Sequence, residues 1–312
     1  MRNLNLSERK VLSILEEDCR ISASKIAKQT NLSPEGVIKV IKRLQNNKIL
    51  AKFKTKISYS RMGYTLLPVN IKLKKVNKDI IKRIKATIKQ HKSFTWYKFC
   101  EGEYDLMLSF KIGSAADRSD MNNLISKLSD LIAEKEVSVV LSAFEICKSF
   151  LDQKHKNKIF KTLDHTEKPI DLSQEDHKLI NLLRKNSRES VLTLANKLNS
   201  TARKVMVQLK RLEKAGVISG FKSKINMTIL NYQPCIALMT LGECTDNDFK
   251  KFISYCRYAP GIHYFLHQIG RYDVELTIDS KSLEDLYNLV DDMRNKFPFI
   301  NKITTLIAKE VF

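Results

Sequence analysis

The sequence contains few of the residues that interrupt regular structure. Of its 312 residues only 9 are glycine and 6 are proline, while 43% are hydrophobic. Such a composition excludes a largely disordered or collagen-like chain. A chain of this length suits two to four compact domains.

Long apolar runs and paired cysteines are also missing. No stretch approaches the roughly 18 uncharged apolar residues that a membrane-spanning helix needs. The opening MRNLNLSERK lacks the apolar run of a signal peptide. We therefore expect no membrane partner and a cytoplasmic location. The 6 cysteines include no Cys-x-x-Cys pair, so we expect no metal site, no cofactor and no dense disulfide framework.

Acidic residues are the third shortage. Lys and Arg number 55 against 34 Asp and Glu, a formal net charge of +21. Counting Lys and Arg against Asp and Glu gives 13 to 5 in residues 1–60 and 12 to 5 in residues 170–231, but 9 to 11 in residues 232–312. Because the excess peaks in two separate segments, nucleic acid is the favoured partner.

The two basic segments are copies of one unit. LSPEGVIKVIKRLQNNKI (residues 32–49) and NSTARKVMVQLKRLEKAGVI (residues 199–218) share a pattern in which Leu212 falls 168 positions after Leu44. The same offset aligns a Gly-x-Tyr-Asp motif at residues 102–105 with one at 270–273. The chain is therefore an internal duplication.

Each basic segment is predicted to form three helices and a hairpin. In the first copy we expect helices over residues 7–17, 23–30 and 33–47, the last capped by Ser33 with Pro34 at its first position. An apolar stripe would bury Val37, Ile38, Ile41 and Leu44, with Val40 mostly off it. In the second copy the stripe contains Val205, Met206, Leu209 and Leu212.

A hairpin wing is expected after the third helix of each copy. ILAKFKTKI (residues 49–57) alternates apolar and basic residues, and VISGFKSKIN follows in the second copy. This is the plan of a winged helix-turn-helix, whose third helix enters the major groove of DNA. Lysines at every second position would lie along a phosphate backbone.

A β-α-β-β-α-β order follows each basic segment, with YTLLPVNIKL as its first strand and VSVVLSAFEI (residues 137–146) as its last in the first copy. This order predicts a ferredoxin-like domain. The expected fold class is α+β. We expect the following domains: winged helix-turn-helix 1–60, ferredoxin-like 61–150, linker 151–169, winged helix-turn-helix 170–231, ferredoxin-like 232–312.

The combination resembles the Lrp/AsnC (feast/famine) family of transcription regulators, on the strength of LSPEGVIKVIKRLQNNKIL and GEYDL, and the resemblance covers nearly the whole chain twice. It implies sequence-specific binding of double-stranded DNA without enzymatic activity, and control by an amino acid or other small effector. By the same resemblance, the effector contacts would be Gly102, Tyr104, Asp105, Gly270, Tyr272 and Asp273. Family members usually carry one such unit per chain, so we expect the two ferredoxin-like domains to pair as an intrachain pseudo-dimer, with further homo-oligomerisation left open.

The predicted DNA contacts come from the third helices and the wings. Arg203 and Lys204 can reach guanine acceptors, whereas Glu35 can accept only from a cytosine amine or repel phosphate, so the two copies should not read the same bases. The full predicted set is Ser33, Glu35, Gly36, Lys39, Lys42, Arg43, Lys52, Lys54, Lys56, Thr201, Arg203, Lys204, Gln208, Lys210, Arg211, Lys222 and Lys224.

Three alternatives stay open at this point. The Gly-x-Tyr-Asp loops also have a purely structural interpretation, in which the glycine makes the turn and the Asp bonds to backbone N–H groups. Siroheme decarboxylases are built on a similar scaffold, and His263 and His267 are the only residues that favour such an enzyme here. A protein that coats DNA without choosing a sequence is the third possibility.

Overall fold

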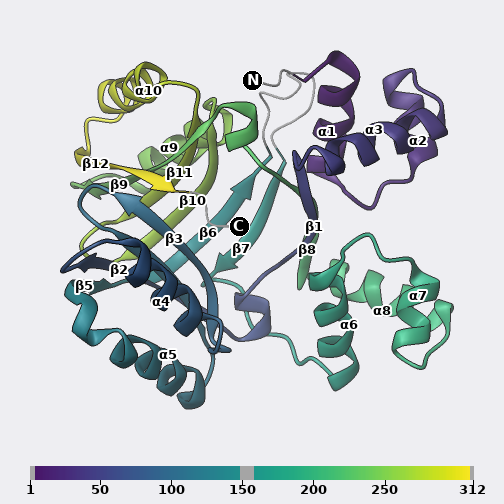
Figure 1. The fold of residues 1–312 in the computed structure, drawn as a ribbon, viewed down its shortest axis with the longest axis horizontal. Helices are drawn as coiled ribbons and strands as arrows, with labels where there is room; N and C mark the ends of the chain where they lie inside the picture. The colour runs from purple at the N-terminus through teal and green to yellow at the C-terminus, as the bar shows by residue number, and fades with distance from the viewer. Residues whose placement is uncertain (1–3, 148–157, 310–312) are drawn as a thin grey trace.

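Two small helical domains lie side by side at one end of the molecule, and a large sheet with helices lies at the other (Figure 1). The computed structural model describes residues 4–147 and 158–309. Within these residues, no helix is long and apolar enough to cross a membrane.

The helical domains are copies, and we call them the first and second heads. The first contains α1 (Leu6–Glu17), α2 (Ala23–Thr30) and α3 (Pro34–Asn46). The second contains α6 (Gln174–Lys185), α7 (Val191–Lys197) and α8 (Ala202–Lys214). The start of α8 follows the start of α3 by 202 less 34, which is 168, so the duplication seen in the sequence is kept in the fold.

The wing hairpins predicted from the sequence are wrong. Each copy contributes a single strand, β1 (Leu50–Ile57) or β8 (Ile218–Ile225), and these two strands pair with each other in an antiparallel ribbon between the heads. Lys54 faces Lys222, its own equivalent 168 positions later, so a local two-fold axis passes through this pair. The other face of the ribbon, with Ile57 and Phe221, joins one apolar core shared by both heads.

The α/β halves each have the ferredoxin-like strand order. In the first half the order is β5 (Ile132–Val137), β2 (Thr65–Leu73), β4 (Leu106–Ile112), β3 (Phe94–Glu101). In the second half it is β12 (Ile300–Lys309), β9 (Gln233–Leu241), β11 (Val274–Ser280), β10 (Ile262–Ile269). The outer faces are covered by α4 (Lys78–Ile88) and α5 (Ala115–Lys127), and by α9 (Asp246–Tyr258) and α10 (Leu283–Lys296).

Strand exchange joins the two halves. The end of β12 pairs with β3, where Ile307 faces Glu101, and β6 (Val139–Ile146) pairs with β10, where Val139 faces Ile269. Ile307 is the equivalent of Val139, and Ile269 of Glu101, so the same contact is made twice in opposite senses, as in a two-fold dimer.

Two sequence predictions for this region need correction. The fourth strand of the first half is β5 rather than residues 137–146. The strand is interrupted near the buried Ser138, after which the chain continues as β6 and pairs with β10 of the other half. The predicted linker at residues 151–169 contains β7 (Ile159–Asp164), which pairs with β6.

Candidate nucleic-acid interface

Helix α3 begins where the sequence predicts. The Ser33 hydroxyl accepts a hydrogen bond from the Gly36 N–H at 3.0 Å, and Pro34 stands in the first turn. Val40 is buried with 7% of its surface exposed, whereas Ile38 is 45% exposed, so their predicted places were reversed. Positions 37, 40, 41 and 44 follow the helical repeat of i, i+3, i+4 and i+7, and position 38 lies about 100° away from that face.

Helix α8 repeats this geometry. The Thr201 hydroxyl accepts from the Lys204 N–H at 3.3 Å, and Val205, Leu209 and Leu212 are buried. Met206, predicted to be buried, is 45% exposed at the position equivalent to Ile38. We call α3 and α8 the recognition helices; α3 exposes Ile38 to solvent among polar neighbours, and α8 exposes Met206 and Val207.

The outward faces of the two recognition helices carry exposed cations. Lys39 and Lys42 are exposed on α3, and Arg203, Lys204 and Lys210 are exposed on α8. Among the residues that the structure describes, none of these five forms an ion pair.

The two outward faces also differ in charge. Glu35 and Gly36 stand where the second copy has Arg203 and Lys204. Such cations are available to phosphates or base edges, and the two faces should prefer different bases.

Three of the predicted DNA contacts are occupied within the protein. Arg43 pairs with Glu8 at 3.0 Å, and Arg211 pairs with the equivalent Asp176, which also accepts from Gln208 at 2.8 Å. Burial alone would raise the pKa of Asp176, but hydrogen bonds from Arg211, Gln208 and Ser173 lower it to about 2. These contacts tie each recognition helix to the first helix of its head, so Arg43, Gln208 and Arg211 already have partners within the protein and are not among the contacts proposed below.

The ribbon lysines do not line an open wing. The Lys222 side chain is 2% exposed, and its ammonium group lies 2.8 Å from Glu16 Oε1, 2.9 Å from Glu145 Oε1 and 3.1 Å from the Ile146 carbonyl oxygen. Lys56 pairs with the other oxygen of Glu145. Because these three acceptors take its three donors, Lys222 is unavailable to phosphate. Lys56 is mostly buried, with 17% of its side chain exposed, and its pairing with Glu145 turns it away from the role predicted for it.

The remaining ribbon lysines lie on the same face but nearer to solvent. Burial and the charges of Lys224, Lys52 and Lys222 lower the pKa of Lys54 to about 8. Lys52 is exposed and Lys224 is half-buried. Of the five predicted wing contacts, only Lys52 has the exposure that a phosphate contact requires.

Contacts that sequence reasoning missed fix the heads to each other. The Arg20 guanidinium lies 5.2 Å from the centre of the Phe221 ring, and the equivalent Arg188 lies 5.1 Å from the Phe53 ring. Arg20 also donates to the Ser187 and Glu189 carbonyl oxygens of the second head. Arg20 and Arg188 are 168 residues apart, as are Phe53 and Phe221. This offset was the one feature of the sequence that could have pointed to the two contacts.

The Asp of each Gly-x-Tyr-Asp loop has a structural role. Asp105 accepts from the Leu73 N–H at 2.9 Å, and Asp273 accepts from the Leu241 N–H at 2.7 Å. Gly102 has φ +134°, and a Cβ atom there would lie 2.8 Å from Leu306 Cδ2. The structural interpretation of these motifs therefore accounts for Gly102, Asp105 and Asp273.

The tyrosines of the loops meet at the junction of the two halves, where their rings pack edge to face at 6.4 Å. Tyr272 donates to Glu103 at 2.7 Å, and Tyr104 donates to Glu136. Arg271 pairs with Glu103 at 2.6 Å and with Glu136 at 2.9 Å. Position 103 is a glutamate where its equivalent, position 271, is an arginine, so duplication has allowed a complementary pair that two identical chains could not form.

The two histidines weighed for enzyme chemistry are engaged in packing and pairing. His263 Nδ1 lies 3.0 Å from Asp279 Oδ2, and the His267 ring lies 4.6 Å from that of Phe249. Burial lowers the pKa of His267. In the described part of the chain no group of three His, Cys, Asp or Glu residues is placed to hold a metal ion.

Comparisons with known proteins match each copy separately. Residues 4–50 and 173–219 match the family model described as winged helix-turn-helix DNA-binding. An uncharacterized HTH-type transcriptional regulator of Pyrococcus furiosus is 33% identical over 121 residues, 39% of this chain and 78% of that protein. The HTH-type transcriptional regulator LrpC of Bacillus subtilis is 28% identical over 142 residues, 45% of this chain and 94% of that protein.

Both copies are covered at once by the fold of a known enzyme. The siroheme decarboxylase NirDL aligns over 97% of this chain and 91% of its own, with a TM-score of 0.62 and 12% identity, which shows a shared fold. The relatives identified by sequence are regulators that each span about one copy. This chain belongs to the Lrp/AsnC family of HTH-type transcriptional regulators, with the family's unit present twice.

Proposed function

We propose that the chain is a sequence-specific transcriptional regulator, without enzymatic activity, that binds one double-stranded DNA site with both heads. The observation that supports this most is the pair of recognition helices whose exposed cations have no partner among the described residues. The ribbon, Arg20 and Arg188 hold the heads in one arrangement, so the two helices act at a fixed spacing. Lys39, Lys42, Arg203, Lys204 and Lys210 are the proposed contacts, with Lys52 beside them.

The operator should be asymmetric. In a symmetric dimer identical helices read identical half-sites. Here Glu35 and Gly36 face one half-site, while Arg203 and Lys204 face the other. The exposed side chains of Ile38 and Met206 are suited to contact thymine methyl groups at equivalent positions of the two half-sites.

Pairing of the two α/β halves within the chain takes the place of a dimer in this proposal. The Arg271 ion pairs to Glu103 and Glu136 favour this arrangement over pairing between identical halves, which would oppose like charges. An amino acid or other small effector at residues 102–105 and 270–273 would have to displace these contacts. Effector binding would therefore be coupled to the pairing of the two α/β halves.

Selection of bound duplexes from a random pool tests the proposal. Enrichment of a motif with two unlike half-sites is the expected result. Enrichment of DNA without a motif would indicate a coating protein instead. A second candidate, a tetrapyrrole enzyme, is favoured by the fold match to the siroheme decarboxylase, and it predicts no DNA retention together with saturable titration by an iron porphyrin.

A further inference from the structure

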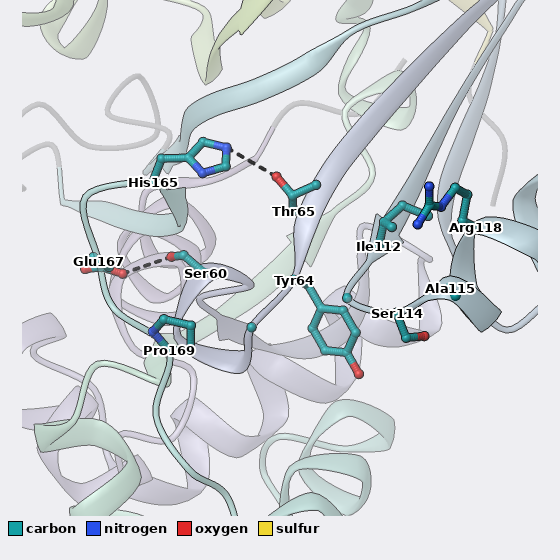
Figure 2. A pocket seen from close by; sticks show the side chains of 12 residues that line it. Ser60, Tyr64, Thr65, Ile112, Ser114, Ala115, Arg118, His165, Glu167 and Pro169 are labelled. Carbon is teal, nitrogen blue, oxygen red and sulfur yellow. Dashed lines mark hydrogen bonds between the residues drawn. The ribbon is translucent and has the colours of Figure 1, made fainter.

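A cavity of about 610 Å³ lies where the first α/β half meets the segments that lead into the heads. One side is formed by Tyr64, Ser114 and Arg118, and the other by Thr65, His165 and Pro169 (Figure 2). Its volume falls within the range of about 300 to 1,000 Å³ that is typical of small-molecule sites.

Most polar side chains of this cavity are already bonded to the protein. His165 Nε2 lies 3.2 Å from the Thr65 hydroxyl, and Glu167 accepts from Ser58 and Ser60 at 3.0 and 3.1 Å (Figure 2). The nearby carboxylate of Asp117 accepts from Gly113 and Ser114. Arg118 differs, because its guanidinium group has neither a hydrogen bond nor an ion pair among the residues that the structure describes.

Two further cations lie around Tyr64. The Lys111 ammonium group stands 4.6 Å from the centre of the Tyr64 ring, and burial followed by the charge of Arg184 lowers the pKa of Lys111. Arg184 belongs to α6 of the second head and is exposed. Neither forms an ion pair in the described residues, and the nearby Asp117 carboxylate offsets only part of their charge, so the cavity and its rim keep a positive excess.

A second cavity, of about 440 Å³, lies in the second α/β half and overlaps the place equivalent to the first at Tyr232, Ser280 and Lys281, which match Tyr64, Ile112 and Gly113. The residue equivalent to Arg118 is the buried Leu286. The second cavity is instead lined by three carboxylates, those of Asp279, Asp285 and Asp292, and by one cation, Lys281, whose ammonium group lies 5.5 Å from the centre of the Tyr232 ring. The positive charge is therefore specific to the first cavity and is not a general property of the fold.

We propose that the first cavity binds a small organic anion, a molecule with a carboxylate or phosphate group and a short apolar body. The planar fork of Arg118 matches either group with two parallel hydrogen bonds. Ile112, Ala115 and Pro169 offer apolar surface to the rest of the molecule.

The position of the cavity gives such a ligand a route to the heads. Ile170 donates to the Arg61 carbonyl oxygen, and Arg61 pairs with Glu167, so the segment leading to α6 is fastened to the turn (Ser60–Met62) that follows β1. A ligand that contacts both this segment and Arg118 would stabilise one placement of the second head. This regulatory step rests on the proposed DNA-binding function, whereas the binding of the anion does not.

Calorimetric titration of the full chain, free of DNA, tests the site with inorganic phosphate and with succinate. One saturable site per chain is expected for at least one probe, and the probe that binds identifies the group. Arg118→Ala should weaken binding at least tenfold, and Arg118→Lys, which keeps the charge without the fork, several-fold. Lys82→Ala, which removes an exposed charge from α4, should stay within twofold of the wild type.

No saturable binding of either probe, or equal binding by Arg118→Ala, would overturn the proposal. Two or more sites per chain unaffected by Arg118→Ala would show ordinary counterion binding and would overturn it as well. Since DNA affinity is measured separately in probe-free buffer, a chain that binds phosphate but ignores DNA would refute the proposed function and leave this site standing.

Discussion

The buried lysine of the ribbon gives the sharpest test of the fold. In the Lys222→Met variant the apolar stem is kept and the ammonium group is lost. That group meets three acceptors, from Glu16, Glu145 and the Ile146 backbone, and the Glu16 side chain is 1% exposed. Removing one partner of a buried ion pair leaves an uncompensated charge and costs about 3 to 5 kcal/mol. Because Lys56 still neutralises Glu145, we expect a loss near 3 kcal/mol in the free energy of unfolding.

Urea denaturation at pH 7 measures this loss. Lys52→Met is the matched control, because Lys52 lies on the same face of the ribbon but is exposed, and its effect should stay within about 0.5 kcal/mol. Adding Glu16→Gln to Lys222→Met should recover part of the loss by removing the orphaned charge. A loss below about 1 kcal/mol for Lys222→Met would refute the buried triad.

The same variant separates the structure from the wing predicted by sequence. A wing lysine on phosphate would lower the slope of log affinity against log salt by about one. The folded Lys222→Met chain should keep the wild-type slope, and a slope reduced by one would return Lys222 to the DNA.

Further predictions concern the core, pH and base readout. Leu212→Ala should lower the free energy of unfolding by about 2 to 5 kcal/mol, since Leu212 is 0% exposed beneath α8, and denaturation that shows no loss would contradict its placement. Burial raises the pKa of Glu275 from 4.5 to about 7, so its ionisation weakens the fold as pH rises through that range. Glu275→Gln should therefore stabilise the protein at pH 8 by about 2 to 3 kcal/mol and have little effect at pH 4, and equal effects at both would exclude a buried acid. Arg203→Ala should cost about 1 to 3 kcal/mol on a selected duplex and less on a shuffled one, and equal losses on both would mean that Arg203 contacts phosphate only.

The helices of the two heads and the internal repeat could be predicted from the sequence. Ser33 and Pro34 mark the start of α3 because capping is decided within one turn of helix. The 168-residue offset survives in both recognition helices and in the ribbon register. Such features depend on neighbours in the chain, which a sequence displays directly.

Contacts between the copies could not be predicted in the same way. An alternating segment such as KFKTKI indicates a strand but does not name its partner, and β1 pairs with a strand 168 residues away rather than with its own hairpin. β6 pairs with β10 of the other half, and this pairing depends on how the two sheets lie against each other in the folded chain. At the candidate nucleic-acid interface, Lys42 and Arg203 are exposed, as a contact to DNA requires. Arg43 and Lys222 instead pair with Glu8 and Glu16, which lie near them only in the folded chain.

The central claim is that the ribbon holds two unlike recognition helices so that both engage one duplex. Inserting five base pairs between the half-sites of the selected operator tests it most directly, since half a helical turn moves one half-site to the opposite face of the DNA. Measured by fluorescence anisotropy, affinity for this operator should fall to that of a single half-site, and an insertion of ten or eleven base pairs should not restore it fully because the heads are fixed. Unchanged affinity after the five-base-pair insertion would show that the heads bind independently and would contradict the account.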